Sequence, residues 1–241
     1  MDEKELRTSP KQRVFIILIA IFMVGSIVAS YAVIVISGSQ AANDSTENKI
    51  DPAKVAQYKE EYDEKSAELK EISKSDYERF MKYKNEEVKS YNEVSANDPG
   101  VETKDLEKGT GEKVKDDNYL AYYVGWCADE SVFDSSFDDN EKPTGFAKVL
   151  DPSAGMIEGW TAGVEGMRIG GIREITVPGE LAYGDQMEIC GGKNKPLKFL
   201  ILAVDNKDPL KTLASEIDDA YMRYQYAQYG IDYDDVSQGT E

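Results

Sequence analysis

Hydrophobic and polar residues follow three different patterns along the 241-residue chain. Residues 14–36 form an unbroken run of 23 residues without a charge, and a helix of that length covers about 30 Å of hydrocarbon. Residues 51–92 and 209–229 place apolar side chains three, four and seven positions apart, which predicts helices. Residues 97–208 contain short apolar or alternating runs separated by Gly, Pro, Asp and Asn, which predicts a mostly antiparallel sheet.

The run at 14–36 is interpreted as a retained membrane anchor. Four basic residues precede it: Lys4, Arg7, Lys11 and Arg13. The next positive charge is Lys49, so the charge bias predicts a single-pass protein of the cell membrane, with residues 1–13 as a cytoplasmic tail. Residues 37–50 are then a linker, and the chain beyond them is extracytoplasmic. The alternatives are a cleaved signal peptide, although such signals have apolar regions of roughly 7–15 residues, and a buried helix of a soluble core.

Residues 51–96 are predicted to form a helical stalk. Asp51-Pro52 supplies an N-cap followed by a proline in the first turn. Ser75 and Glu78 have the spacing of a capping box, so a second helix is expected to begin there. Two interpretations stay open. The stalk would form a homodimer or hold client chains, or it is a solvated spacer that packs lightly on the neighbouring domain.

The β-rich part is expected to contain four strands, at 119–126, 146–150, 172–177 and 197–204. A short helix is expected between the second and third strands, at 161–167. Asp208-Pro209 repeats the cap-then-proline signal and opens the helix at 209–229, and residues 230–241 are an acidic tail.

Composition narrows the chemistry that the chain can perform. With 46 acidic residues against 28 basic ones the net charge is −18, which disfavours nucleic acid as a partner. The absence of histidine excludes Ser-His and Cys-His nucleophiles and imidazole metal sites. Two cysteines cannot form a four-thiolate zinc site, and the acidic loops lack the spacing of a calcium loop. No metal or cofactor is therefore expected, and the chemistry must use carboxylates, tyrosines, backbone groups or pocket shape.

Five short motifs occur in order within the β-rich part. They are AYYVG at 121–125, VFDSS at 132–136, MIEGW at 156–160, GVEGMRIGG at 163–171 and ELAYG at 180–184, and Phe199 follows on the last strand. This ordered set resembles the FKBP-type peptidyl-prolyl cis-trans isomerases over about residues 101–208. The resemblance implies an α+β fold in which an antiparallel half-barrel sheet wraps on a short helix. It also implies an apolar pocket for proline-containing polypeptides, and it gives residues 97–208 as the isomerase domain.

The resemblance implies a set of site residues. Those expected to act on the reacting amide are Asp134, Tyr183 and Ile157. Those expected to bind the substrate are Tyr123, Phe133, Met156, Trp160, Ile189 and Phe199. In this scheme Trp160 is the floor beneath the prolyl ring, and the Tyr183 hydroxyl and the Ile157 N–H donate hydrogen bonds to the substrate carbonyl. Rotation about a peptide bond needs neither a nucleophile nor proton exchange with solvent, so it suits a chain without histidine.

The chain also departs from the family pattern. Asp138 and Asp139 stand where a basic residue usually follows the VFDSS block, so the basic partner of Asp134 is expected to be missing, and Thr144 stands where an aromatic residue is common. The flap at 185–192 lacks the usual proline-rich apolar tip. These departures favour an alternative function, a binding module or holdase chaperone without turnover. A purely structural envelope protein is a third interpretation, but it leaves the motifs unexplained.

The two cysteines occupy informative positions. Cys127 ends the strand that carries Tyr123, and Cys190 lies in the flap. An extracytoplasmic location allows them to form a disulfide that tethers the flap. Two free buried thiols are the equally weighted alternative.

Overall fold

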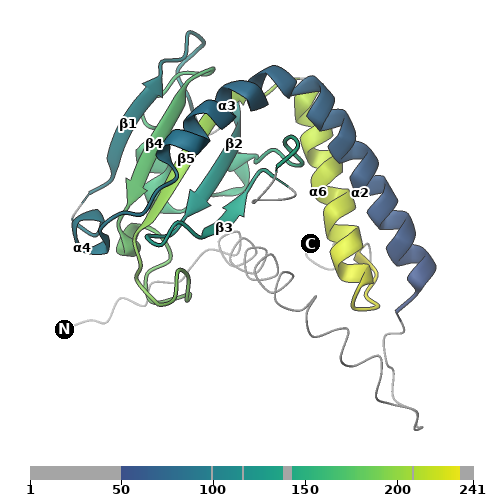
Figure 1. Ribbon diagram of the computed structural model, residues 1–241. Coiled ribbons are helices and arrows are strands. Elements are labelled where there is room, and N and C mark those ends of the chain that lie inside the picture. The colour runs from purple at the N-terminus through teal and green to yellow at the C-terminus, as the bar shows by residue number, and fades with distance from the viewer. Residues whose placement is uncertain (1–49, 99, 116, 138–142, 208, 234–241) are drawn as a thin grey trace, which may run out of the picture.

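The computed structural model describes residues 50–233 except 99, 116, 138–142 and 208. Its centre is an antiparallel sheet in the order β1-β4-β5-β2-β3 (Figure 1). The strands are β1 (Glu102–Glu107), β2 (Tyr119–Trp126), β3 (Val132–Ser135), β4 (Ile172–Val177) and β5 (Leu197–Asp205). The helices are α2 (Pro52–Ile72), α3 (Lys74–Glu87), α4 (Glu93–Ala96), α5 (Glu158–Val164) and α6 (Leu210–Ala227), and the short 3-10 helices are η1 (Pro152–Ala154) and η2 (Gly179–Leu181).

Both faces of the sheet are buried along its inner strands β4, β5 and β2. Successive side chains of a strand point to opposite faces, and along β2 the residues Tyr119, Ala121 and Tyr123 belong to one hydrophobic cluster. The intervening residues, such as Leu120 and Tyr122, belong to the other cluster. β5 alternates in the same way, so the two central strands read as nearly continuous apolar runs. The predicted antiparallel sheet with helices is confirmed, and each of its faces carries helices.

On the first face, α5 lies very close to β4. A Cβ atom added at Gly159 would lie 2.1 Å from a methyl group of Val177, and one added at Gly163 would lie 2.8 Å from Ile175. Glycine at these two positions, four apart on the helix, therefore allows the backbone of α5 to approach the strand. That approach puts Trp160, which follows Gly159 directly, into the first cluster.

On the second face, the helices flanking the sheet in sequence share its core. Leu69 of α2, Phe80 of α3 and Ile217 of α6 are buried in the same cluster as Leu120 and Leu200. Figure 1 shows α2 and α6 as an antiparallel pair beside the sheet, while α3 lies across it. The range 51–96, expected to form a stalk, thus contains helices that pack on the sheet and on α6.

Three helix predictions were tested. The N-cap at Asp51 is confirmed, because its side chain accepts a hydrogen bond from the Ala53 N–H at 2.9 Å. The capping box at Ser75 was wrong: the break lies at Ser73, whose hydroxyl donates to the Leu69 carbonyl, and α3 begins at Lys74. The helix expected at 161–167 is α5, which begins and ends three residues earlier.

The early end of α5 has a local reason. Glu165 leaves helical geometry, and Gly166 adopts a left-handed φ of 73°, a conformation that glycine reaches without strain.

The strand expected at 146–150 does not form. The edge of β2 that it would join is already occupied, because β3 pairs along residues 124–126 and the Ser136 N–H donates to the Tyr123 carbonyl. Only Leu150 reaches this edge, in an isolated bridge with Ala121. The strands β1 and β3 were not predicted as strands. The cap residue Asp208 lies outside the described residues.

Within the described part of the chain, no helix combines the length and the apolar character that a bilayer crossing requires. The predicted anchor at 14–36, the tail at 1–13 and most of the linker at 37–50 lie outside that part.

The contribution of α3 to the core can be tested by Phe80→Ala. Phe80 is fully buried, so we expect the substitution to lower the free energy of unfolding by about 3–5 kcal/mol in urea denaturation. Val94→Ala is the control, because Val94 is 80% exposed in the neighbouring helix α4, and it should change stability by less than about 0.5 kcal/mol. A loss below about 1 kcal/mol for Phe80→Ala would contradict a shared core.

Candidate active site

A cavity of about 520 Å³ opens between the first face of the sheet, α5 and α6. Eight of the nine predicted site residues line it: Tyr123, Phe133, Asp134, Met156, Ile157, Trp160, Tyr183 and Phe199. Ile189 does not line it. This residue is buried in the first cluster and pairs with Gly192 inside the flap, and its apolar contact with the substrate stays a prediction.

Aromatic rings form the base of the cavity. Trp160 is only 1% exposed, and the rings of Tyr123 and Phe199 meet it edge-on at centroid distances of 5.7 and 5.5 Å. The Phe133 ring stands edge-on to Phe199 at 5.5 Å. The indole N–H of Trp160 donates to the Tyr119 hydroxyl at 3.0 Å, which satisfies its polar group within the core. These rings together make a rigid apolar surface.

The rings leave no space for extra atoms at Gly125 of β2. A Cβ atom added there would lie 2.5 Å from the Phe133 ring and 3.0 Å from Phe199. The glycine of the AYYVG motif therefore lets these two rings pack over the strand.

Asp134 is the polar group of this wall, and three donors hold its carboxylate. The Tyr123 hydroxyl donates to Oδ2. The Ser135 N–H and the Lys148 ammonium donate to Oδ1 at 2.8 and 3.0 Å. The expectation that Asp134 lacks a basic partner was wrong, because Lys148 supplies one. It does so from the 146–150 segment, which folds back along β2 instead of following the VFDSS block directly.

Two tyrosine hydroxyls of the site stay protonated at neutral pH. Burial raises the pKa of Tyr123 well above its usual value, and the nearby charge of Asp134 raises it further. Burial and then Asp134 also raise the pKa of Tyr183. Within the described ranges no group accepts a hydrogen bond from the Tyr183 hydroxyl, so this donor is available to a ligand.

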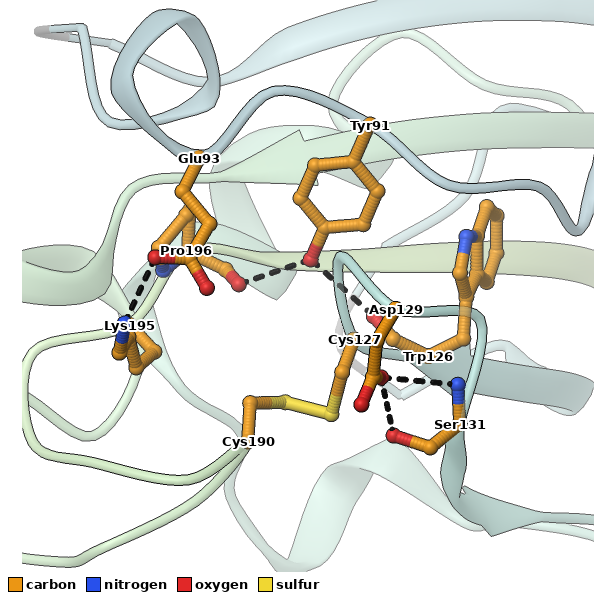
Figure 2. Close-up of a disulfide and its surroundings, with 9 residues drawn as sticks. All are labelled: Tyr91, Glu93, Trp126, Cys127, Asp129, Ser131, Cys190, Lys195 and Pro196. Atoms are coloured by element: carbon orange, nitrogen blue, oxygen red, sulfur yellow. Dashed lines mark hydrogen bonds and ion pairs between the residues drawn. A yellow bond between two sulfur atoms is a disulfide. The ribbon is translucent and has the colours of Figure 1, made fainter.

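Cys127 and Cys190 form a disulfide. Figure 2 shows it joining the end of β2 to the flap that follows Tyr183. The Tyr91 hydroxyl lies 2.9 Å from the Pro196 carbonyl oxygen and 3.3 Å from that of Trp126. The disulfide and the Tyr91 contacts therefore fix the flap to the sheet at two places.

Tyr91 lies in the segment at residues 88–97, between α3 and β1, and further contacts attach this segment to the base of the flap. Lys195 and Glu93 form an ion pair at 2.6 Å, which Figure 2 also shows. The Asn97 side chain accepts from the Gly179 N–H, at the start of η2, at 2.8 Å. The segment between α3 and β1 thus holds both ends of the loop that carries Tyr183.

The far wall of the cavity was missed by the sequence analysis. It is formed by α6 and the residues that follow it, and its members are Lys211, Ser215, Asp218, Asp219, Tyr221, Met222 and Tyr233. The signal was present in the spacing, because positions 211, 215, 218 and 222 form a helical stripe beside the buried stripe of Leu213 and Ile217. The polar residues in this stripe gave no reason to assign it to a pocket.

Asp218 carries a perturbed pKa within this wall. Surrounding protein raises the pKa of its carboxyl to about 6, Lys148 opposes the shift, and Asp219 and Asp151 add to it. Asp218 is also exposed on the pocket side, where water screens the effect, so a value of about 6 is an upper limit. In the described part of the chain, no group of three or more Cys, Asp or Glu side chains is arranged to hold a metal ion.

Comparison with known proteins identifies the family of this fold and site. The family model for FKBP-type peptidyl-prolyl cis-trans isomerase matches residues 109–204. An FK506-binding protein of Neisseria meningitidis serogroup B is 36% identical over 107 residues, which cover 44% of this chain and 93% of that protein. The chain belongs to the FKBP-type peptidyl-prolyl cis-trans isomerase family. Its enzyme class is therefore peptidyl-prolyl cis-trans isomerase, and the helices α2, α3 and α6 lie outside the family match.

A longer isomerase of the family also matches. The FKBP-type isomerase FkpA of Escherichia coli strain K12 is 34% identical over 140 residues, and the match spans 55% of this chain but only half of that protein. The crystal structure of FkpA aligns with 75% of this chain and 80% of its own at 23% identity and a TM-score of 0.37. The crystal structure of AtFKBP13 aligns with 45% of this chain and 94% of its own, at 33% identity and a TM-score of 0.34. The family assignment rests on the sequence matches.

The disulfide can be tested by replacing both cysteines with serine. The bond closes a loop with a sequence separation of 63, so its loss should lower the free energy of unfolding by about 4 kcal/mol in the chain-entropy model. Urea denaturation measures this, with the wild-type protein in reductant as the matched control. Equal stability of the oxidised and double-serine proteins would contradict a stabilising bond.

Asp218 makes the stability depend on pH in a definite direction. Its folded pKa lies above the unfolded one, so the folded state holds this proton more tightly, and ionisation destabilises it as pH rises through about 6. Asp218→Asn removes this penalty. We expect the variant to gain more stability over wild type at pH 8 than at pH 5, measured by urea denaturation. An equal gain at both pH values would contradict the raised pKa.

Proposed function

We propose that this isomerase is anchored in the cell membrane by residues 14–36 and rotates X-Pro bonds of polypeptides outside the cytoplasm. The charge-free run and the basic residues before it support the anchor and its orientation. The disulfide supports an oxidising compartment, because such bonds persist outside the cytoplasm. Dimerisation through residues 51–96 stays a prediction. Part of the apolar stripe expected to serve it, including Leu69 and Tyr62, packs on the sheet and on α6.

The observation that carries the proposed mechanism is a cavity with an apolar aromatic base and two free donors in its lining. Resonance keeps a peptide bond planar with a barrier of ~18–20 kcal/mol and places negative charge on the oxygen. An apolar cavity stabilises this polarised planar form less well than water does, whereas the twisted form is less polarised. Binding that prefers the twisted amide by ~5.5 kcal/mol gives an acceleration of about 10⁴.

In this mechanism the rings hold the proline and the donors hold the preceding carbonyl. Trp160 supports the prolyl ring, and Tyr123, Phe133 and Phe199 surround it. The Ile157 N–H precedes the first turn of α5, and within the described ranges it donates to no other group. This N–H and the Tyr183 hydroxyl bind the oxygen of the twisting amide. Met156, beside Ile157, contacts the substrate chain.

Asp134 positions the aromatic wall in this scheme. Its carboxylate fixes the Tyr123 hydroxyl, and Lys148 balances its charge so that the wall carries an ion pair instead of an isolated anion. The alternative function, a binding module or holdase without turnover, drew support from the expected absence of a basic partner for Asp134. Lys148 removes that support, and the altered flap is the feature that still favours the alternative.

An isomerase assay on a proline-containing peptide tests the proposal. We expect the full chain to accelerate cis-trans exchange over the spontaneous rate. Tyr183→Phe should lower kcat/KM about two- to tenfold, because one hydrogen bond contributes about 0.5–1.5 kcal/mol. Trp160→Ala should abolish both turnover and peptide binding, with circular dichroism to check the fold.

Tyr229→Phe is the matched control, since Tyr229 is an exposed tyrosine away from the cavity. It should behave as wild type. Peptide binding without acceleration would favour the holdase, and full activity in Tyr183→Phe would remove the hydroxyl from the mechanism.

A further inference from the structure

The cavity extends beyond the residues of the family match. Its volume of about 520 Å³ is in the range that holds a drug-sized ligand, so it accommodates more than one prolyl side chain. The additional wall comes from α6, outside the matched residues 109–204. A client whose proline rests on Trp160 therefore has a neighbouring residue within reach of α6.

Contacts between α2 and α6 hold this wall in place. Lys65 of α2 forms an ion pair with Glu216 of α6 at 2.5 Å. The Tyr62 ring packs against the Tyr221 ring at a centroid distance of 5.5 Å. α6 also buries Leu213 in the core of the sheet. Contacts with α2 and with the core of the sheet therefore hold α6 in position.

Charged residues of the aromatic wall act electrostatically on residues of the α6 wall. Lys148 forms the ion pair with Asp134 at 3.0 Å, and it also acts on the carboxyl of Asp218. Burial and then Asp134 raise the pKa of Tyr221 to about 12. One continuous cavity therefore brings groups of the α6 wall close to the proposed catalytic residues.

The α6 wall combines apolar surface with an excess of negative charge. Met222 and Tyr221 are half-buried and line the cavity. Asp218, Asp219 and Asp151 line it as well, and Lys148, a cation that acts on Asp218, is paired with Asp134. Lys211, one turn before Ser215, is the other cation of the lining. Three carboxylates thus face one remaining lysine.

We infer that α6 is a specificity wall of the isomerase pocket, where Asp218, Asp219 and Met222 bind the client side chain adjacent to the proline and select a basic residue over an acidic one. This inference rests on the proposed isomerase function of the same cavity. A lysine or arginine side chain has a long aliphatic stem and a charged head. The stem packs on Met222 and Tyr221, and the head lies among the carboxylates, whereas an acidic side chain is repelled by them.

The test uses two series of proline-containing peptides and the full chain. One series carries Lys, Gln or Glu before the proline, and the other carries the same residues after it. kcat/KM is measured at pH 8 and low salt and compared within each series. We expect Lys to exceed Glu by about tenfold in at least one series, and the ratio to shrink at high salt because exposed charges are screened.

Variants connect the selectivity to α6. The double variant Asp218→Asn, Asp219→Asn should bring the Lys-to-Glu ratio close to one. Met222→Ala should raise KM about threefold or more for all peptides by removing an apolar contact. Glu71→Gln is the control, because Glu71 is an exposed carboxylate of α2 that does not line the cavity, and it should keep the wild-type ratio.

Each outcome separates this inference from the proposed function. An active enzyme with a Lys-to-Glu ratio near one, or a ratio that survives the double variant, overturns the specificity wall and leaves the isomerase intact. An unchanged KM in Met222→Ala overturns the contact with the client. Failure to accelerate any peptide overturns the proposed function itself, and direct binding measurements with the same peptides then test the wall by affinity.

Discussion

The structure depends on the burial of both faces of one antiparallel sheet. Because side chains alternate along β2 and β5, each central strand supplies two cores at once. One core places Tyr123 and Phe199 against Trp160 of α5, and the other receives Leu69, Phe80 and Ile217 from the flanking helices. A helix pair beside the sheet and an aromatic cavity on its first face are therefore consequences of the same alternation.

Within the cavity, apolar and polar parts have separate roles. The rings around Trp160 form an apolar base, and the indole N–H is satisfied by Tyr119 inside the core. The single carboxylate of the aromatic wall, Asp134, is held by Tyr123, Ser135 and Lys148. These contacts orient the site residues without a client, and such preorganisation is what differential binding of a twisted amide requires.

The regions outside the family match act on the same site. The segment at 88–97 fixes the flap through Tyr91 and Glu93, and α6 forms the far wall of the cavity. Both are held by contacts with the sheet or with α2. The elements that surround the isomerase fold in sequence therefore line its pocket, in the case of α6, or hold the loop that carries Tyr183.

The local pattern of the chain was sufficient for the family, for the strands β2, β4 and β5, for the long helices and for eight residues that line the cavity. The elements follow from periodicity, and the residues follow from motifs whose members lie close in sequence. The pattern did not decide the contacts between residues that lie far apart in the sequence. Lys148 reaches Asp134 only because a segment folds back along β2, and Cys127 meets Cys190 only when the flap closes on the sheet. Asp218 and Met222 belong to the pocket only because α2 and the core orient α6. Spacing encodes which face of a helix a residue occupies, but what that face meets is decided by packing between distant segments.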